Sequence, residues 1–291
     1  MKSRMLDSGA FTWFNQRMKS HKGGKLNWDL YKTKEFWDYV DSYALFVKKW
    51  SYLFQGYVTV DAVRNPQISW KVTRYLEKEH GLNPIPVVHF GTSEKWLQKY
   101  LDAGHKYIGF GGQIERQPYH PWADKMWNVV CNTPDRLPQI KVHGFAQTKI
   151  QTMARYPWYS VDSVTWKKMG YYGQVVVPQK INGNFSWQAR FISVFTDLIS
   201  PYTKRSGNGG GRHFLHLSRR EQRTVREWLD HIGIEFGTQK KDGTIIQLGV
   251  SNDKQERVAA NIELFCWLQS QMPQWPWSWE GPPVTRRTLK Y

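Results

Sequence analysis

The chain has 291 residues, a formal net charge of +17 at pH 7 and 40% hydrophobic residues. This length suffices for one large α/β domain or two small ones, and no apolar run is long enough to span a bilayer. The excess of Lys and Arg favours a polyanionic partner. Nucleic acid fits better than an anionic membrane surface, because the sequence contains no strongly basic amphipathic helix.

The cysteines and the N-terminus bear on the cellular setting. Cys131 and Cys266 are too few for a disulfide framework, and they form no metal-binding or redox pair. The first residues lack the apolar run of a secretory signal. We therefore expect a reducing cytoplasm, with both cysteines acting as small buried side chains.

Short apolar, β-branched runs alternate with amphipathic stretches along the first 200 residues. A polar loop is expected at 15–34. The expected strands are 4–7, 57–61, 85–91, 107–112, 139–144, 160–162 and 174–177. The expected helices are 35–50, 66–79, 93–103, 122–130, 149–156 and 187–199.

This alternation predicts a mostly parallel sheet with helices outside, and seven or eight such units predict an α/β fold of the (β/α)8 TIM-barrel type. The eighth strand is either Arg212–Leu217 or Thr244–Leu248. We expect the barrel to occupy residues 1–217. Residues 218–291 would form a basic C-terminal extension packed on it.

The extension has its own signals. Ser218 and Glu221 form a capping box before a helix, Lys240–Gly243 indicates a hairpin turn, and a final helix is expected over 252–271. Before it, the glycine-rich loop that contains Lys204, Arg205 and Arg212 is a candidate contact for nucleic acid.

Polar residues and glycines recur where the expected strands end. Strand ends of one barrel share a mouth, which is where active sites of this fold are built. These residues are Asp7, Ser8, Gly9, Asp61, His89, Gly111, Gly112, His143, Gly144 and Asp162. Two carboxylates at one mouth suit displacement at an anomeric carbon, one as nucleophile and one as proton shuttle.

The ordered set of motifs resembles the queuine tRNA-ribosyltransferase (tRNA-guanine transglycosylase) family across residues 4–166. Asp7-Ser8-Gly9-Ala10-Phe11 is similar to the family's Asp-Ser-Gly-Gly-Phe motif, and Val161-Asp162-Ser163 is similar to its Phe-Asp-Cys/Ser motif. The resemblance implies that Asp162 is the nucleophile and Asp7 the general acid/base. It also implies that Asp61, His89, Gly111, Gly112, Ser8, Gly9, His143 and Gly144 surround the base.

The sequence departs from the family at two points. The tRNA enzymes carry a Cys-x-Cys-x-x-Cys…His zinc site after the nucleophile, and this chain has no such ligands. His89 also stands where the family has a base-contacting glutamine. These features look more like the phage branch, which places 7-deazaguanine derivatives into DNA.

The expected function is therefore exchange of guanine in nucleic acid, with phage DNA in a host cytoplasm as the favoured substrate, for a preQ0- or preQ1-like base. The mechanism uses a covalent aspartyl-glycosyl intermediate and needs no metal or other cofactor. Two alternatives stay open: the same reaction on tRNA, and a non-catalytic barrel that only binds nucleic acid.

Overall fold

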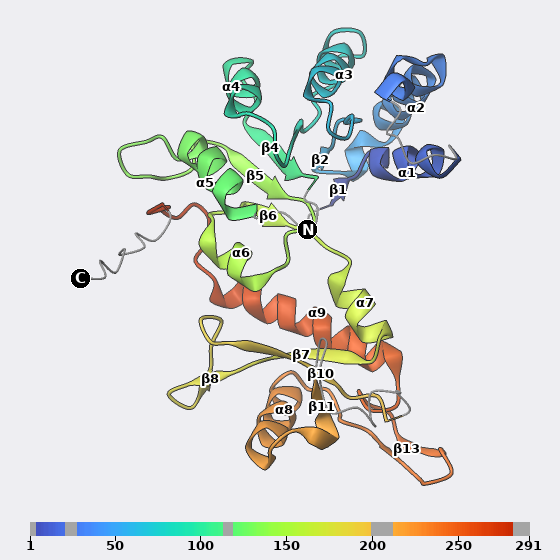
Figure 1. The fold of residues 1–291 in the computed structure, drawn as a ribbon, viewed down its shortest axis with the longest axis vertical. Coiled ribbons are helices and arrows are strands. Elements are labelled where there is room, and N and C mark those ends of the chain that lie inside the picture. The colour runs from blue at the N-terminus through green and yellow to red at the C-terminus, as the bar shows by residue number, and fades with distance from the viewer. Residues whose placement is uncertain (1–3, 21–27, 113–118, 199–211, 282–291) are drawn as a thin grey trace, which may run out of the picture. The chain divides into compact units, whose positions relative to one another are not determined.

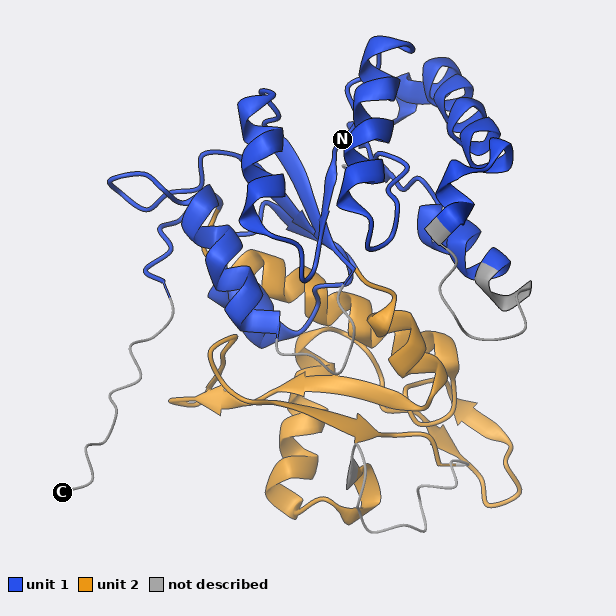
Figure 2. Ribbon diagram, turned by 45° about the horizontal axis from the view of Figure 1, so that its top comes forward, with its two compact units in different colours: residues 1–162, 275–291 blue, residues 163–274 orange. Residues whose placement is uncertain are grey.

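A computed structural model describes residues 4–20, 28–112, 119–198 and 212–281. The chain divides into two compact units, shown in Figure 2. Unit 1 comprises residues 1–162 with 275–291, and unit 2 comprises residues 163–274. The boundary expected after residue 217 falls inside unit 2.

Unit 1 is a mixed α/β structure in which short strands alternate with helices (Figure 1). Its strands are β1 (Met5–Leu6), β2 (Gly56–Tyr57), β3 (Val87–His89), β4 (Tyr107–Gly111), β5 (Lys141–Gly144) and β6 (Ser160–Val161). Its α-helices are α1 (Ala10–Ser20), α2 (Lys34–Trp50), α3 (Pro66–Lys78), α4 (Glu94–Asp102), α5 (Tyr119–Val130) and α6 (Ile150–Arg155), and its 3₁₀ helices are η1 (Trp28–Lys32) and η2 (Ser51–Leu53).

Every recorded strand pairing in unit 1 is parallel and joins strands that are consecutive in the chain. β1 pairs with β2, and β3, β4, β5 and β6 pair in that order. A parallel bridge between Val58 and Ile85 connects the end of β2 to the start of β3. The expected alternation of parallel strands and helices is thus confirmed for the first six expected strands, which all end at the same edge. The seventh, expected at 174–177, instead lies in unit 2 and pairs antiparallel.

Local sequence signals begin α3 and α4 where helices were expected. Asn65 caps α3 by accepting from the Ile68 N–H at 3.1 Å, with Pro66 in the first turn. Ser93 caps α4 by accepting from Lys95 N–H. The helices lie outside the strands (Figure 1), and their apolar faces build two clusters of buried side chains.

One cluster covers the first strands and the other covers β3 to β6. Phe36, Val40 and Val47 of α2 pack in the first, and Trp127 of α5 lies in the second. Trp279, from the C-terminal stretch of unit 1, joins the second cluster and is only 3% exposed.

Unit 2 has a different arrangement. Its central sheet has the order β11-β10-β7, in which β10 pairs antiparallel with β7 and parallel with β11. The central strands are β7 (Gln174–Pro178), β10 (Phe191–Phe195) and β11 (Arg212–His213). Two hairpins are formed by β8 (Lys180–Ile181) with β9 (Asn184–Phe185) and by β12 (Thr238–Gln239) with β13 (Ile245–Gln247). The helices among the described residues of this unit are α7 (Thr165–Tyr171), η4 (Phe214–His216), α8 (Arg219–His231) and α9 (Lys254–Gln271).

Two buried polar side chains of α9 connect the parts of unit 2. Arg257 donates to the carbonyl groups of Gly170 and Val250, both at 2.9 Å. Asn261 accepts from the Val176 N–H at 3.0 Å and donates to the Gln174 carbonyl at 3.0 Å. The long helix is therefore tied to α7 and β7 by hydrogen bonds as well as by apolar packing.

Several detailed expectations for the later part of the chain are confirmed. The capping box of Ser218 and Glu221 begins α8, the turn at Lys240–Gly243 closes the β12–β13 hairpin, and the helix expected over 252–271 is α9. Both candidates for an eighth strand contain short strands of unit 2, namely β11 and β13.

Three expectations are wrong. The helix expected at 187–199 is replaced by β10, because Ile192 and Val194 alternate with more exposed neighbours and fill the sheet interior. The loop expected at 15–34 begins inside α1, which continues to Ser20 because Trp13 and Phe14 bury one helix face. Cys131 is buried as expected, whereas Cys266 is exposed on α9.

Within the described residues, no helix is both long enough and apolar enough to cross a membrane.

Candidate active site

The predicted site residues of unit 1 follow the parallel strands at one edge. Asp7 comes directly after β1, His89 ends β3, Gly111 ends β4, and Asp162 comes directly after β6. Asp61 lies after the end of β2. Between the two, the Thr59 N–H donates to the Ile85 carbonyl at 2.9 Å. Parallel pairing thus places these residues at the same end of the strands.

The Asp7 carboxylate is exposed to solvent and lies on a turn that hydrogen bonds hold in place. The Gly9 N–H lies 3.4 Å from Asp7 Oδ1, and Gly9 has a φ of +71°, which a side chain would disfavour. Ser8 is buried, and its carbonyl accepts from the Tyr39 hydroxyl. Ser8 and Gly9, predicted to contact a base, therefore also fix the turn that presents Asp7.

The pKa of Asp7 is raised above its ordinary value of 3.8. Loss of water around the carboxyl is the main cause, and the negative charges of Asp61 and Asp162 add to it. The N–H groups of Gly9 and Ser8 oppose the shift without cancelling it. Asp61 and Asp162 therefore both lie within electrostatic reach of Asp7.

Asp61 and His89 form a close pair across neighbouring strands. His89 Nε2 lies 2.6 Å from Asp61 Oδ2, and the two side chains are 5% and 15% exposed, respectively. Because a carboxylate accepts hydrogen bonds, the imidazole Nε2 is the donor. The pair presents a fixed hydrogen-bonding edge beside Asp7.

Asp162 is held through one of its two oxygens. Oδ1 accepts from the Ala146 N–H at 2.8 Å and lies 3.7 Å from His143 Nε2. Ala146 has a φ of +56°, so the loop after β5 adopts a costly conformation to aim this N–H. Among the described residues, Oδ2 has no hydrogen-bond partner, and the side chain is 57% exposed.

The pKa of Asp162 is lowered below its ordinary value. Partial loss of water would raise it, but the contact with His143 and the hydrogen bond from Ala146 together outweigh that effect. The strand-end carboxylates are thus perturbed in opposite directions: Asp7 toward the acid form and Asp162 toward the carboxylate. Such a pair is suited to one proton carrier and one nucleophile.

His143 is buried and connects Asp162 to two hydroxyl groups. Its Nδ1 lies 2.8 Å from Ser160 Oγ, which in turn lies 2.8 Å from the Tyr107 hydroxyl. Its Nε2 is buried without a hydrogen-bond partner among the described residues. An unpaired buried polar atom costs about 1–3 kcal/mol, so this nitrogen is expected to serve a group that approaches it.

Sequence reasoning missed Tyr107, Ser160 and the Ala146 N–H. A signal for Ser160 was present, because residues two apart on a strand share a face and Ser160 stands two before Asp162. Ser160 is also the register partner of His143. The position of the Ala146 N–H depends on a positive φ at a residue other than glycine, which the sequence does not indicate.

The glycines at the strand ends make room for neighbouring side chains. A methyl group on Gly112 would come 2.9 Å from the His89 ring, and one on Gly144 would come 2.9 Å from Gln147 and Trp158. Gly111 lies against Val87 and Phe145. Close packing accounts for all three glycines, and contact between their backbone and a base stays a prediction.

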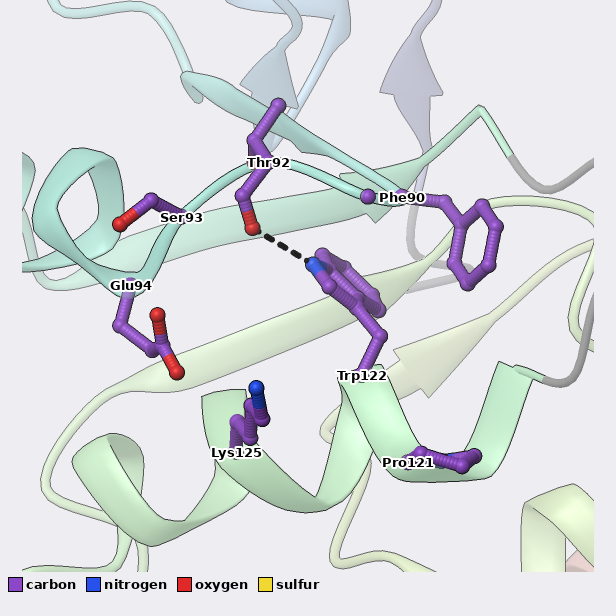
Figure 3. A pocket seen from close by; sticks show the side chains of 8 residues that line it. Phe90, Thr92, Ser93, Glu94, Pro121, Trp122 and Lys125 are labelled. Atoms are coloured by element: carbon purple, nitrogen blue, oxygen red, sulfur yellow. Dashed lines mark hydrogen bonds between the residues drawn. The ribbon is translucent and has the colours of Figure 1, made fainter.

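A separate pocket of about 430 Å³ lies beside the end of β3 (Figure 3). The Trp122 indole donates to the Thr92 carbonyl at 2.9 Å across it, and Phe90 packs on Trp122. The pocket is lined by Phe90, Gly91, Thr92, Ser93, Glu94, Pro121, Trp122 and Lys125. The three aspartates are not among these residues, so this pocket is distinct from the carboxylate site.

Two of the three residues expected to contact nucleic acid lie outside the described part of the chain. Lys204 and Arg205 lie outside the described residues, and Arg212 begins β11 without a described side chain. In the described part of unit 2, Arg219, Arg220 and Arg223 are exposed on α8. Across the described residues, no group of three or more His, Cys, Asp or Glu side chains could hold a metal ion.

Comparison of the sequence with models of protein families and with curated proteins finds no match.

Proposed function

We propose that this chain exchanges guanine in nucleic acid, with DNA favoured, for a 7-deazaguanine derivative such as a preQ0- or preQ1-like base. The observation that carries the proposal is the placement of two carboxylates, Asp7 and Asp162, directly after parallel strands of one unit, with their pKa values shifted in opposite directions. The Asp61–His89 pair beside them supplies a polar edge for a base.

The reaction is a double displacement. Oδ2 of Asp162 attacks C1′ of the target nucleotide, the bond from C1′ to guanine breaks, and Asp7 gives a proton to the departing base. The incoming base then attacks C1′ through N9, the bond from C1′ to Asp162 breaks, and Asp7 takes the N9 proton. The net charge is the same before and after each step, because the negative charge passes from Asp162 to Asp7 and back, and Asp7 regains its starting protonation state.

The raised pKa of Asp7 and the lowered pKa of Asp162 favour these roles. A raised pKa keeps the Asp7 carboxyl protonated to higher pH, so that it has a proton to give at the first step, and an ionised carboxylate is the reactive nucleophile. The target base must leave the stack to reach a carboxylate, so we expect nucleotide flipping or a single-stranded substrate.

We also propose that the parallel strands of unit 1 belong to a barrel of the (β/α)8 type. In a flat sheet, five steps of about 4.8 Å would separate the ends of β1 and β6 by about 24 Å. Screening would make a charge effect over that distance negligible. The effect of Asp162 on the pKa of Asp7 supports a sheet that curves back on itself.

The alternative polymer is tRNA, because a charge of +17 suits either nucleic acid. A non-catalytic binding barrel is disfavoured, because three acids placed together weaken phosphate binding unless they serve chemistry. The polymer and the chemistry can be tested in one experiment.

The test is incorporation of labelled guanine into duplex DNA, single-stranded DNA and tRNA. Wild type is compared with Asp162→Ala and with Asp38→Ala, which removes an exposed carboxylate of α2 that pairs with Lys34. We expect label in DNA with wild type and Asp38→Ala, and a loss of about a thousandfold or more with Asp162→Ala.

If label enters tRNA alone, the substrate of the exchange is tRNA and not DNA. If no polymer takes up label and denaturing gels show no covalent adduct, the transglycosylase proposal is wrong. An adduct without label would instead place the error at base selection, with His89 the first residue to change.

A further inference from the structure

A chain of polar groups runs from Tyr107 to the candidate nucleophile. The Tyr107 hydroxyl lies 2.8 Å from Ser160 Oγ, and Ser160 Oγ lies 2.8 Å from His143 Nδ1. His143 Nε2 then faces Asp162 Oδ1 at 3.7 Å. These four residues come from β4, β5 and β6 and from the position directly after β6.

The protons of this chain can be assigned by counting donors. If Tyr107 donates to Ser160, the Ser160 hydroxyl is free to donate to His143 Nδ1, and the imidazole proton lies on Nε2. In the opposite order, His143 would donate to Ser160 and Ser160 to Tyr107. The Nε2 lone pair would then face the Asp162 carboxylate, and the Tyr107 proton would have no acceptor among the described residues.

The arrangement in which Tyr107 donates to Ser160 and Ser160 donates to His143 is favoured for two reasons. An N–H directed at a carboxylate is attractive, whereas a lone pair directed at it is repulsive. His143 also packs edge-to-face with Phe145 at a centroid distance of 4.5 Å, so its ring is not free to turn away. Its Nε2 has no other partner in the described part of the chain.

We propose that Tyr107 and Ser160 are positioning residues that hold His143 as the Nε2–H tautomer aimed at Asp162 Oδ1. This inference rests on the proposed function only for its catalytic consequence, because the tautomer is a property of the free protein.

The catalytic consequence concerns the covalent intermediate. When Oδ2 is bonded to C1′, Oδ1 is the carbonyl oxygen of the ester, with the N–H groups of Ala146 and His143 directed at it. As the incoming N9 attacks C1′, the C1′–Oδ2 bond breaks and its electron pair returns to the carboxylate. The hydrogen bond from the Ala146 N–H and the charge attraction of the nearby His143 N–H stabilise the charge that develops there.

The tautomer is tested by nitrogen-15 NMR of the histidine rings without substrate, with His143→Gln used to assign the signal. We expect wild type to carry its proton on Nε2 and Ser160→Ala to show a mixture of tautomers. Tyr159→Phe is the matched control, because it removes the hydroxyl of a neighbouring tyrosine that packs on Tyr107 but lies outside the chain. Protonation of Nδ1 in wild type, alone or together with Nε2, would overturn the proposal.

The consequence is tested by trapping the Asp162 adduct and timing its decay on addition of the incoming base. We expect Ser160→Ala and Tyr107→Phe to slow decay about ten- to a hundredfold, and Ser160→Thr to restore most of the rate. Unchanged decay in both variants would overturn the catalytic part. If wild type forms no adduct, the proposed function fails, and the NMR result alone decides the tautomer.

Discussion

Asp7 and Asp162 show how two residues of one type acquire different properties within one site. Loss of water and two negative neighbours raise the pKa of Asp7, whereas His143 and the Ala146 N–H lower that of Asp162. The two groups must therefore affect folding stability with opposite signs. This difference gives a test that needs no substrate.

For Asp7, the folded pKa lies above the unfolded value, so ionised Asp7 costs stability once the pH exceeds both. For Asp162, the folded pKa lies below the unfolded value, so its stabilisation is present above pH 3.8 and is lost as the pH falls through the folded pKa. At pH 7, Asp7→Asn should raise the melting temperature and Asp162→Asn should lower it.

Shifts of about 1–3 °C are expected, because partial exposure of both groups limits each effect to less than about 1 kcal/mol. Thermal unfolding measured from pH 3 to 7 checks the prediction, and both differences should shrink toward pH 3. Asp38→Asn is the exposed control. Shifts of the same sign for Asp7 and Asp162 would contradict the opposite perturbation.

At the scale of the element, β4 depends on two glycines that face one aromatic ring. A methyl group on Gly109 would overlap the Phe145 ring, whereas one on Gly111 would come 3.4 Å from it. Phe145 directly precedes Ala146, whose N–H contacts Asp162, so the fit between β4 and this ring also sets the position of the Asp162 contact. Packing of the strand and geometry of the site are therefore coupled.

We predict that Gly109→Ala destabilises the fold by about 1–3 kcal/mol and that Gly111→Ala costs less. Chemical unfolding of both variants gives the order directly. Phe145→Leu combined with Gly109→Ala should recover part of the loss, because the smaller side chain relieves the overlap. Equal destabilisation by Gly109→Ala and Gly111→Ala, with no recovery of stability in the double variant, would show that contact with the Phe145 ring does not determine these losses.

At the scale of the whole molecule, the charge of +17 should govern affinity for the polymer. Each phosphate neutralised contributes about 0.9 to the slope of log affinity against log salt for duplex DNA, and about 0.7 for single strands. We predict a steep loss of oligonucleotide binding with salt, and little change for the free base.

Two sets of variants locate the contact. Replacing Lys204, Arg205 and Arg212 by Ala should flatten the slope by about 2–3 units if the glycine-rich loop binds phosphates. Replacing Arg219, Arg220 and Arg223 by Gln in α8 is the comparison, because it removes an equal charge from another part of unit 2. If only the α8 variants show a flatter slope, the phosphate contacts lie on that helix and not on the glycine-rich loop.

The sequence indicated the order of strands and helices in unit 1 because each signal is local. Capping residues such as Asn65 and Ser93 mark helix starts, and β-branched runs mark strands. Phe191–Phe195 was misassigned because its strand character depends on pairing with Gln174–Pro178, a non-local contact. At the site, single residues such as Asp7 could be named, but the chain Tyr107–Ser160–His143 depends on strand register.

The C-terminal stretch of unit 1 returns to it after 112 residues of unit 2. The Trp279 N–H donates to the Arg136 carbonyl at 3.0 Å, and its ring lies beside Tyr156. During synthesis, the ribosome therefore releases the candidate nucleophile, Asp162, long before the tryptophan that completes the packing around β5 and β6. The first unit to be synthesised would therefore be the last to finish folding.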